Sequence, residues 1–170
     1  STSPIGRDAF AGNEKLVNIT LDNTTYLGER MFADCEKLKS VTIPATVKAI
    51  EPGVFSRDVL LEHVVFENTF AGQDMFEYCQ SLKAIEIPNF TKLDDYAFRN
   101  SYLESIVLPN SLETVGTGVF SNSYHLTSIT FGNGIIGNEM FKDCTALESV
   151  TIPAGITEVR ANAFDGCTKL

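Results

Sequence analysis

The chain has 170 residues and a formal net charge of −9, with 22 acidic side chains against 13 basic ones. This acidic balance argues against a nucleic-acid partner, which requires a basic surface, and against electrostatic docking on anionic lipid. No apolar run approaches the length of a membrane-spanning helix, so we expect no membrane insertion in this segment.

A phenylalanine returns every 21 to 23 residues along the chain. The members of this series are Phe10, Phe32, Phe55, Phe76, Phe98, Phe120, Phe141 and Phe164. A fixed period in this range is typical of a solenoid, in which repeats stack and equivalent side chains form ladders. We therefore expect a single domain over residues 1–170, with about seven and a half repeats.

Each repeat contains the same elements in the same order. An aliphatic residue precedes most of the phenylalanines by five positions, at Ile5, Leu27, Ile50, Leu93, Val115, Ile136 and Val159. The segment around the phenylalanine, such as residues 28–35, is too short for an independent helix, and we predict one helical or 3-10 turn there. Two apolar residues spaced by two then predict a strand with one buried face. Such strands are expected at residues 19–21, 41–43, 64–66, 85–87, 106–108, 129–131 and 150–152.

Two nearly identical runs identify the type of repeat. Leu-Lys-Ser-Val-Thr-Ile-Pro occupies residues 38–44, and Leu-Glu-Ser-Val-Thr-Ile-Pro occupies residues 147–153. Blocks of the form Gly-x-x-Met-Phe-x-x-Cys occur at residues 28–35, 72–79 and 137–144. These motifs resemble the BspA-type leucine-rich repeats. The resemblance implies a leucine-rich-repeat solenoid with a right-handed superhelix, a parallel β-sheet on its concave side and short helical or 3-10 turns opposite.

The same resemblance suggests a place and a role for the protein. Members of the family are mostly bacterial surface proteins, and several are described as adhesins. Leu170 occupies the leucine position of a repeat whose strand does not follow, so we expect the chain to be a piece of a longer protein. Solenoid ends without a polar capping repeat can also pair with a second copy.

The cysteines give little sign of chemistry. Each follows a ladder phenylalanine by three positions, at Cys35, Cys79, Cys144 and Cys167. Only Cys144 and Cys167 lie in adjacent repeats, and the sequence leaves open whether they are bonded. No catalytic, metal-binding or phosphate-binding motif is present in the sequence. We therefore expect no catalytic residues, no metal site and no cofactor, and a protein that is not an enzyme.

The outward residues of the predicted strands would line the concave face. Most of them are small hydroxyl residues, and larger or charged side chains interrupt them in the middle repeats. The candidate ligand-binding residues on this face are Thr42, His63, Val65, Glu86, Val107, Thr130 and Thr151.

Our leading hypothesis is a non-enzymatic, extracellular or cell-surface domain that binds a host-matrix protein, another surface protein or a glycan through this face. One alternative is a structural spacer with no ligand of its own. Another is an intracellular scaffold in a eukaryotic microbe.

Overall fold

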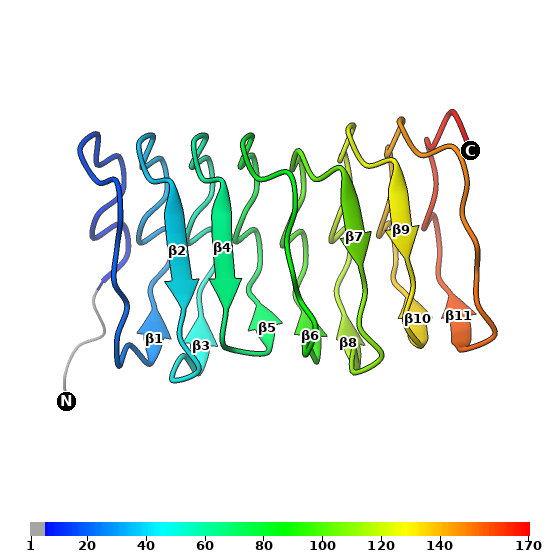
Figure 1. Cartoon of the computed structure of the whole chain (residues 1–170), viewed down its shortest axis with the longest axis horizontal. Coiled ribbons are helices and arrows are strands. Elements are labelled where there is room, and N and C mark those ends of the chain that lie inside the picture. The colour runs from blue at the N-terminus through cyan, green and yellow to red at the C-terminus, as the bar shows by residue number, and fades with distance from the viewer. Residues whose placement is uncertain (1–5) are drawn as a thin grey trace.

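The computed structural model describes residues 6–170, so Ile5 lies outside the described residues. Its strands in chain order are β1 (Tyr26–Leu27), β2 (Ser40–Ile43), β3 (Ala49–Ile50), β4 (His63–Phe66), β5 (Phe70–Ala71), β6 (Lys92–Leu93), β7 (Ser105–Val107), β8 (Thr114–Val115), β9 (Ser128–Thr130), β10 (Gly134–Ile136) and β11 (Ile156–Val159). All strand pairs are parallel and join successive coils, as in the register Val41↔Val64. The predicted parallel-strand solenoid is thus confirmed (Figure 1).

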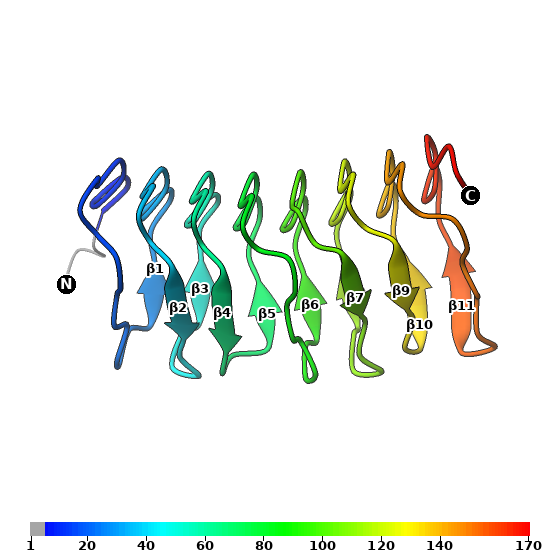
Figure 2. The same ribbon diagram turned by 45° about the horizontal axis from the view of Figure 1, so that its top comes forward.

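The strands form two layers that run in opposite directions (Figures 1 and 2). One layer holds the sheets β2-β4 and β7-β9, and the other holds β1-β3, β5-β6-β8 and β10-β11. The second layer forms at the aliphatic positions before the phenylalanines, where the sequence analysis predicted only a connector. The turns that contain the repeated phenylalanines connect the two layers along one edge of the solenoid. Shorter turns connect the layers along the other edge.

The phenylalanines stack in one continuous column through the solenoid. Consecutive ring centroids lie 5.3 to 5.7 Å apart, and the ring planes differ by 5 to 11°. The rings from Phe55 to Phe141 have no exposed surface, whereas Phe10, in the first coil, is 42% exposed. This column is the centre of the hydrophobic core, because each ring buries a large apolar surface against its neighbours above and below.

The predicted helical or 3-10 turns around the phenylalanines do not form. Residues 6–170 contain no helix of any kind, and therefore none that could cross a membrane. Within each coil the residues two before and two after the phenylalanine both have positive φ, as at Tyr96 (57°) and Asn100 (55°) around Phe98. A right-handed helix requires negative φ at consecutive residues, so these two left-handed positions replace it with a pair of tight turns.

The layer that contains β2, β4, β7 and β9 is interrupted, contrary to the prediction of one strand per coil. Residues 85–87, 150–152 and 19–21 form no strand, and in the first of these coils along the chain only Asn18 forms a bridge, with Ser40. Each of the gaps at residues 85–87 and 150–152 follows a coil whose strand segment ends in phenylalanine rather than in leucine or isoleucine. Phe66 packs edge-on against Phe76 and Phe90, and Phe131 packs edge-on against Phe141. We attribute the two gaps to the packing of these bulkier rings, because they distinguish the coils before the gaps from the coils whose strands pair.

Candidate functional site

We use the term strand face for the exposed side of β2, β4, β7 and β9 together with residues 84–87 and 149–152. All seven candidate residues from the sequence lie exposed on it, as the alternation of side chains in a strand requires. Thr42 is opposite Val65 in the β2-β4 pair, and Val107 is opposite Thr130 in the β7-β9 pair. The exposed fraction is 55% for Val65 and 63% for Val107, which is high for apolar side chains.

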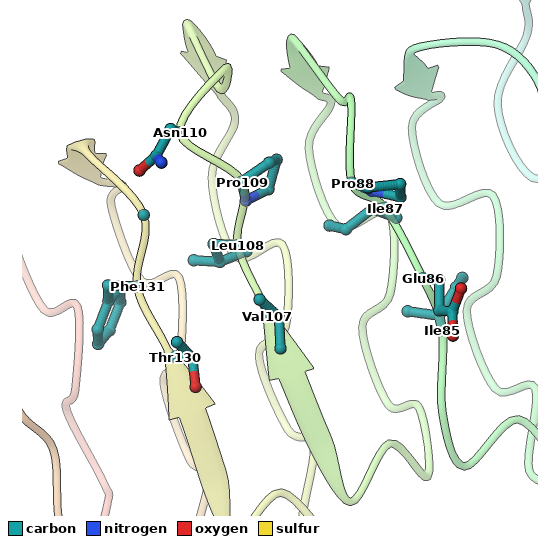
Figure 3. A pocket seen from close by; sticks show the side chains of 11 residues that line it. Ile85, Glu86, Ile87, Pro88, Val107, Leu108, Pro109, Asn110, Thr130 and Phe131 are labelled. Carbon is teal, nitrogen blue, oxygen red and sulfur yellow. The ribbon is translucent and has the colours of Figure 1, made fainter.

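Two neighbouring hollows bring five of the seven candidates together. The first, the apolar hollow, has a volume of about 510 Å³ and is drawn in Figure 3. It lies over three successive coils and is lined by Ile85, Glu86, Ile87, Pro88, Val107, Leu108, Pro109, Asn110, Thr130, Phe131 and Gly132. Only one of these side chains, that of Glu86, is charged.

The second hollow, the acidic hollow, has a volume of about 370 Å³ and lies between β4 and residues 84–88. Its lining includes the carboxylates Glu62 and Glu86 together with His63 and Val65. The two hollows share Ile85, Glu86 and Pro88, which form the wall between them.

The shared wall is the segment where the sheet is interrupted. The backbone N–H groups of residues 84–87 donate to no backbone carbonyl in the described structure. Of their carbonyls, only that of Ile87 accepts a backbone hydrogen bond, from Phe90 in the following turn. Backbone groups without a protein partner bind water or a ligand, because leaving them dry costs free energy.

The ion pairs around the two hollows are unevenly distributed. Glu104 pairs with Lys83 at 3.8 Å, and Glu62 has only His63, with 4.0 Å between Oε2 and Nε2. Glu86 forms no ion pair with any residue of the described structure. The wall between the hollows therefore presents an unpaired carboxylate, with an apolar lining on one side and Glu62 and His63 on the other.

The apolar half of this site was not predicted from the sequence. Ile87, Leu108 and Phe131 were assigned to the core, and Pro88 and Pro109 end the strand segments of adjacent repeats. All five line the apolar hollow. One feature of the sequence could have indicated the apolar hollow. Pro88 and Pro109 occur at the same position of neighbouring repeats, and the next repeat has a strand segment that ends in Phe131. Conversely, Thr42 and Thr151 lie on the strand face but line neither hollow.

The cysteine positions form a buried column rather than a reactive site. All four thiols are buried and free, and those of Cys144 and Cys167 donate to the carbonyls of Phe120 and Phe141, at 3.3 and 3.1 Å. Desolvation raises the pKa of Cys35 to about 11 and that of Cys144 to about 12. Thiols with raised pKa values are weak nucleophiles and weak metal ligands. Residues 6–170 also contain no group of three or more His, Cys, Asp or Glu side chains arranged to hold a metal ion.

Comparison with known proteins agrees with this architecture. The family model for the BspA type leucine rich repeat region, with six copies of the repeat, matches residues 1–103 and 71–170. A search of curated proteins found no match.

Two solved structures from bacteria share the fold. A leucine rich cell surface protein from Faecalibacterium prausnitzii has 25% sequence identity and a TM-score of 0.60, with 97% of this chain and 55% of that chain covered. The leucine rich repeat protein of T. pallidum has 21% identity and a TM-score of 0.75, with 91% and 72% covered. The chain therefore spans about half the length of the Faecalibacterium protein.

Proposed function

The chain belongs to the BspA-type leucine-rich repeat family, and on this premise we propose that residues 1–170 form one non-enzymatic binding domain of an extracellular or cell-surface protein. Its role is adhesion through a protein contact on the strand face, centred on Glu86. A host-matrix protein or another surface protein is the partner class that we favour over a glycan, because none of the seven candidate residues of the strand face is a phenylalanine, tyrosine or tryptophan on which a sugar could stack.

This proposal rests on one observation, which is that exposed apolar side chains, an unpaired carboxylate and two hollows occur together in the middle of the strand face. Val65 and Val107 stay exposed on either side of an unpaired Glu86, above two hollows and an interrupted sheet. Elsewhere the same face carries small hydroxyl residues. Exposed apolar side chains gathered around a concavity are typical of protein contact sites. Support for the location comes from the Faecalibacterium relative, which is described as a cell surface protein.

A binding experiment tests the contact site. The domain is passed over a panel of immobilised extracellular-matrix proteins, a fibrillar collagen among them, and the response is measured by surface plasmon resonance. We expect at least one to bind, and Val107→Ser to weaken that binding while Thr151→Ser leaves it unchanged. No binding to any member of the panel would contradict the proposal and favour the spacer. Binding on which the two substitutions have equal effects would contradict the proposed contact site.

A separate experiment tests the location. An antibody raised against the domain is used to blot fractionated source cells. We expect the band in the cell envelope or the culture medium. A band confined to the cytosol would contradict the proposed extracellular location and favour the intracellular scaffold.

A further inference from the structure

We propose that the two hollows form one recognition site for an extended peptide segment in which a lysine or arginine lies close to a large apolar residue. This inference rests on the proposed function, because it assumes that the strand face binds protein. It adds the chemistry of the partner, which the family membership leaves open.

The apolar half of the partner is indicated by the larger hollow. Its floor and sides come from Ile87, Leu108 and Phe131 with the rings of Pro88 and Pro109 (Figure 3). A volume of about 510 Å³ exceeds that of a single leucine or phenylalanine side chain, so such a group enters without rearrangement of the core. Burying it there removes apolar surface of both molecules from water, including that of Val107.

The basic half of the partner is indicated by the carboxylates. Glu62 and Glu86 both line the acidic hollow, and His63 is the one residue of its lining that can carry a positive charge. Lys83 lies next to Glu62 in an adjoining hollow, but its ammonium group pairs with Glu104. A cation placed between these carboxylates would complement them, and the net charge of −9 on the whole chain attracts the same kind of partner over a longer range. An acidic peptide would meet repulsion from both sources.

The extended form of the partner is indicated by the unpaired backbone. The N–H groups of Ala84, Ile85, Glu86 and Ile87 have no backbone acceptor. Ile85 and Glu86 line both hollows, Ala84 lines the acidic hollow and Ile87 lines the apolar hollow. An extended peptide carries regularly spaced carbonyl and amide groups that can pair with them, whereas a helix has used these groups internally. The apolar hollow, the carboxylates and the unpaired backbone would therefore bind a single peptide segment. Its backbone would lie along the wall between the hollows, and its side chains would enter the two hollows.

An array of short Gly/Ser-based peptides tests the proposal directly. Each peptide carries one leucine or phenylalanine and one lysine or arginine at several spacings, and matched peptides replace the basic residue by glutamate or the apolar residue by serine. The labelled intact chain is applied to the array, and affinities of the strongest peptide are then measured by fluorescence polarisation. We expect binding only where both residues are present, and weakening by added salt.

The matched variants are Glu86→Lys and Glu113→Lys. Both replace an exposed glutamate by lysine, but only Glu86 lines the hollows. We expect Glu86→Lys to lower the affinity for the basic peptide about tenfold or more and to shift the preference toward the glutamate peptide, and Glu113→Lys to change it less than about twofold.

Two results would overturn the inference, and they separate it from the proposed function. The first result is that basic and acidic peptides bind alike, or that the two lysine variants bind the peptide alike. If Val107→Ser still weakens binding to a matrix protein in that case, the peptide chemistry is wrong and the proposed function stands. If neither peptides nor matrix proteins bind in a way that depends on Glu86 or Val107, both fail.

Discussion

The buried carboxyl group of Asp58 accepts a hydrogen bond from the backbone N–H of Cys35 in the preceding coil, with 2.8 Å between Oδ1 and N. Asp58 has no exposed surface, and its other oxygen, Oδ2, has no hydrogen-bond partner. In the equivalent column the other buried residues are neutral cysteines and serines. Desolvation raises the pKa of Asp58 to about 9, so the folded chain holds this carboxyl in its protonated form at neutral pH.

The first prediction concerns the pH dependence of stability. An unfolded aspartate has a pKa of 3.8, so between about pH 4 and pH 9 the folded chain keeps a proton that the unfolded chain releases. The unfolded state binds fewer protons, and the free energy of unfolding falls as pH rises, by at most about 1.4 kcal/mol per pH unit from this group. Asp58→Asn keeps the acceptor without the titration. We expect it to gain stability over the native chain as pH rises.

Thermal unfolding followed by circular dichroism at about pH 5 and about pH 8 measures this difference. The same comparison with Asp165→Asn, at an exposed position of the last coil, is the control. A stability difference between the native chain and Asp58→Asn that stays constant with pH would show that Asp58 is already ionised in the folded chain.

The second prediction concerns the phenylalanine column. Phe98 is fully buried, and its ring centroid lies 5.4 Å from those of both Phe76 and Phe120. Phe98→Ala removes contacts with both neighbours and leaves a cavity, which costs about 3–5 kcal/mol. Phe10→Ala, at an end of the column that is 42% exposed, should cost less than half as much. Urea titrations of the two variants compare these costs, and similar losses would mean that the column does not hold the coils together.

The third prediction concerns the left-handed turns. Asn122 has a φ of 58°, and its N–H donates to the carbonyl of Lys142 in the next coil at 2.8 Å. A β-branched residue is strained in this conformation, so Asn122→Val should lower the free energy of unfolding by about 1–3 kcal/mol. Asn122→Gly should be close to neutral, because glycine adopts positive φ without strain. Equal destabilisation by valine and glycine would assign the role of Asn122 to its side chain instead.

The fourth prediction concerns the interrupted sheet. Phe66 contacts Phe90 with 4.8 Å between ring centroids, and it precedes the unpaired segment 84–87. Phe66→Ile replaces the ring with the smaller side chain found at Ile43, the position that pairs with Phe66 in β2. We expect segment 84–87 to pair with β4 and its amide hydrogens to exchange more slowly, by about tenfold or more.

Hydrogen exchange measured by NMR follows these amides individually. Phe131→Ile is the matched control, because it should slow exchange in residues 150–152 and leave residues 84–87 unchanged. Unaltered exchange in residues 84–87 of Phe66→Ile would show that the ring does not cause the gap.

Much of the fold was predictable because a solenoid repeats its local environment. The spacing of Phe98 and Phe120 placed both rings in one column, and the alternation around Val41 and Ile106 placed two strands and their buried side. The helical turns were wrong because a residue such as Tyr96 gives no sequence signal for positive φ, which the contacts between coils impose on it. The second strand layer was missed because its strands are two to four residues long and carry no alternation.

The sequence by itself determined the solenoid, the phenylalanine column and the exposure of seven residues on the strand face, because these depend only on the period of the repeat and the alternation of a strand. Only the tertiary structure decided where that face is hollowed. The hollows are lined by side chains from neighbouring coils, so they depend on packing across coils, such as that between Phe66 and Phe90. For the same reason Glu62 and Glu86 line one hollow together, and Glu86 and Phe131 line the other.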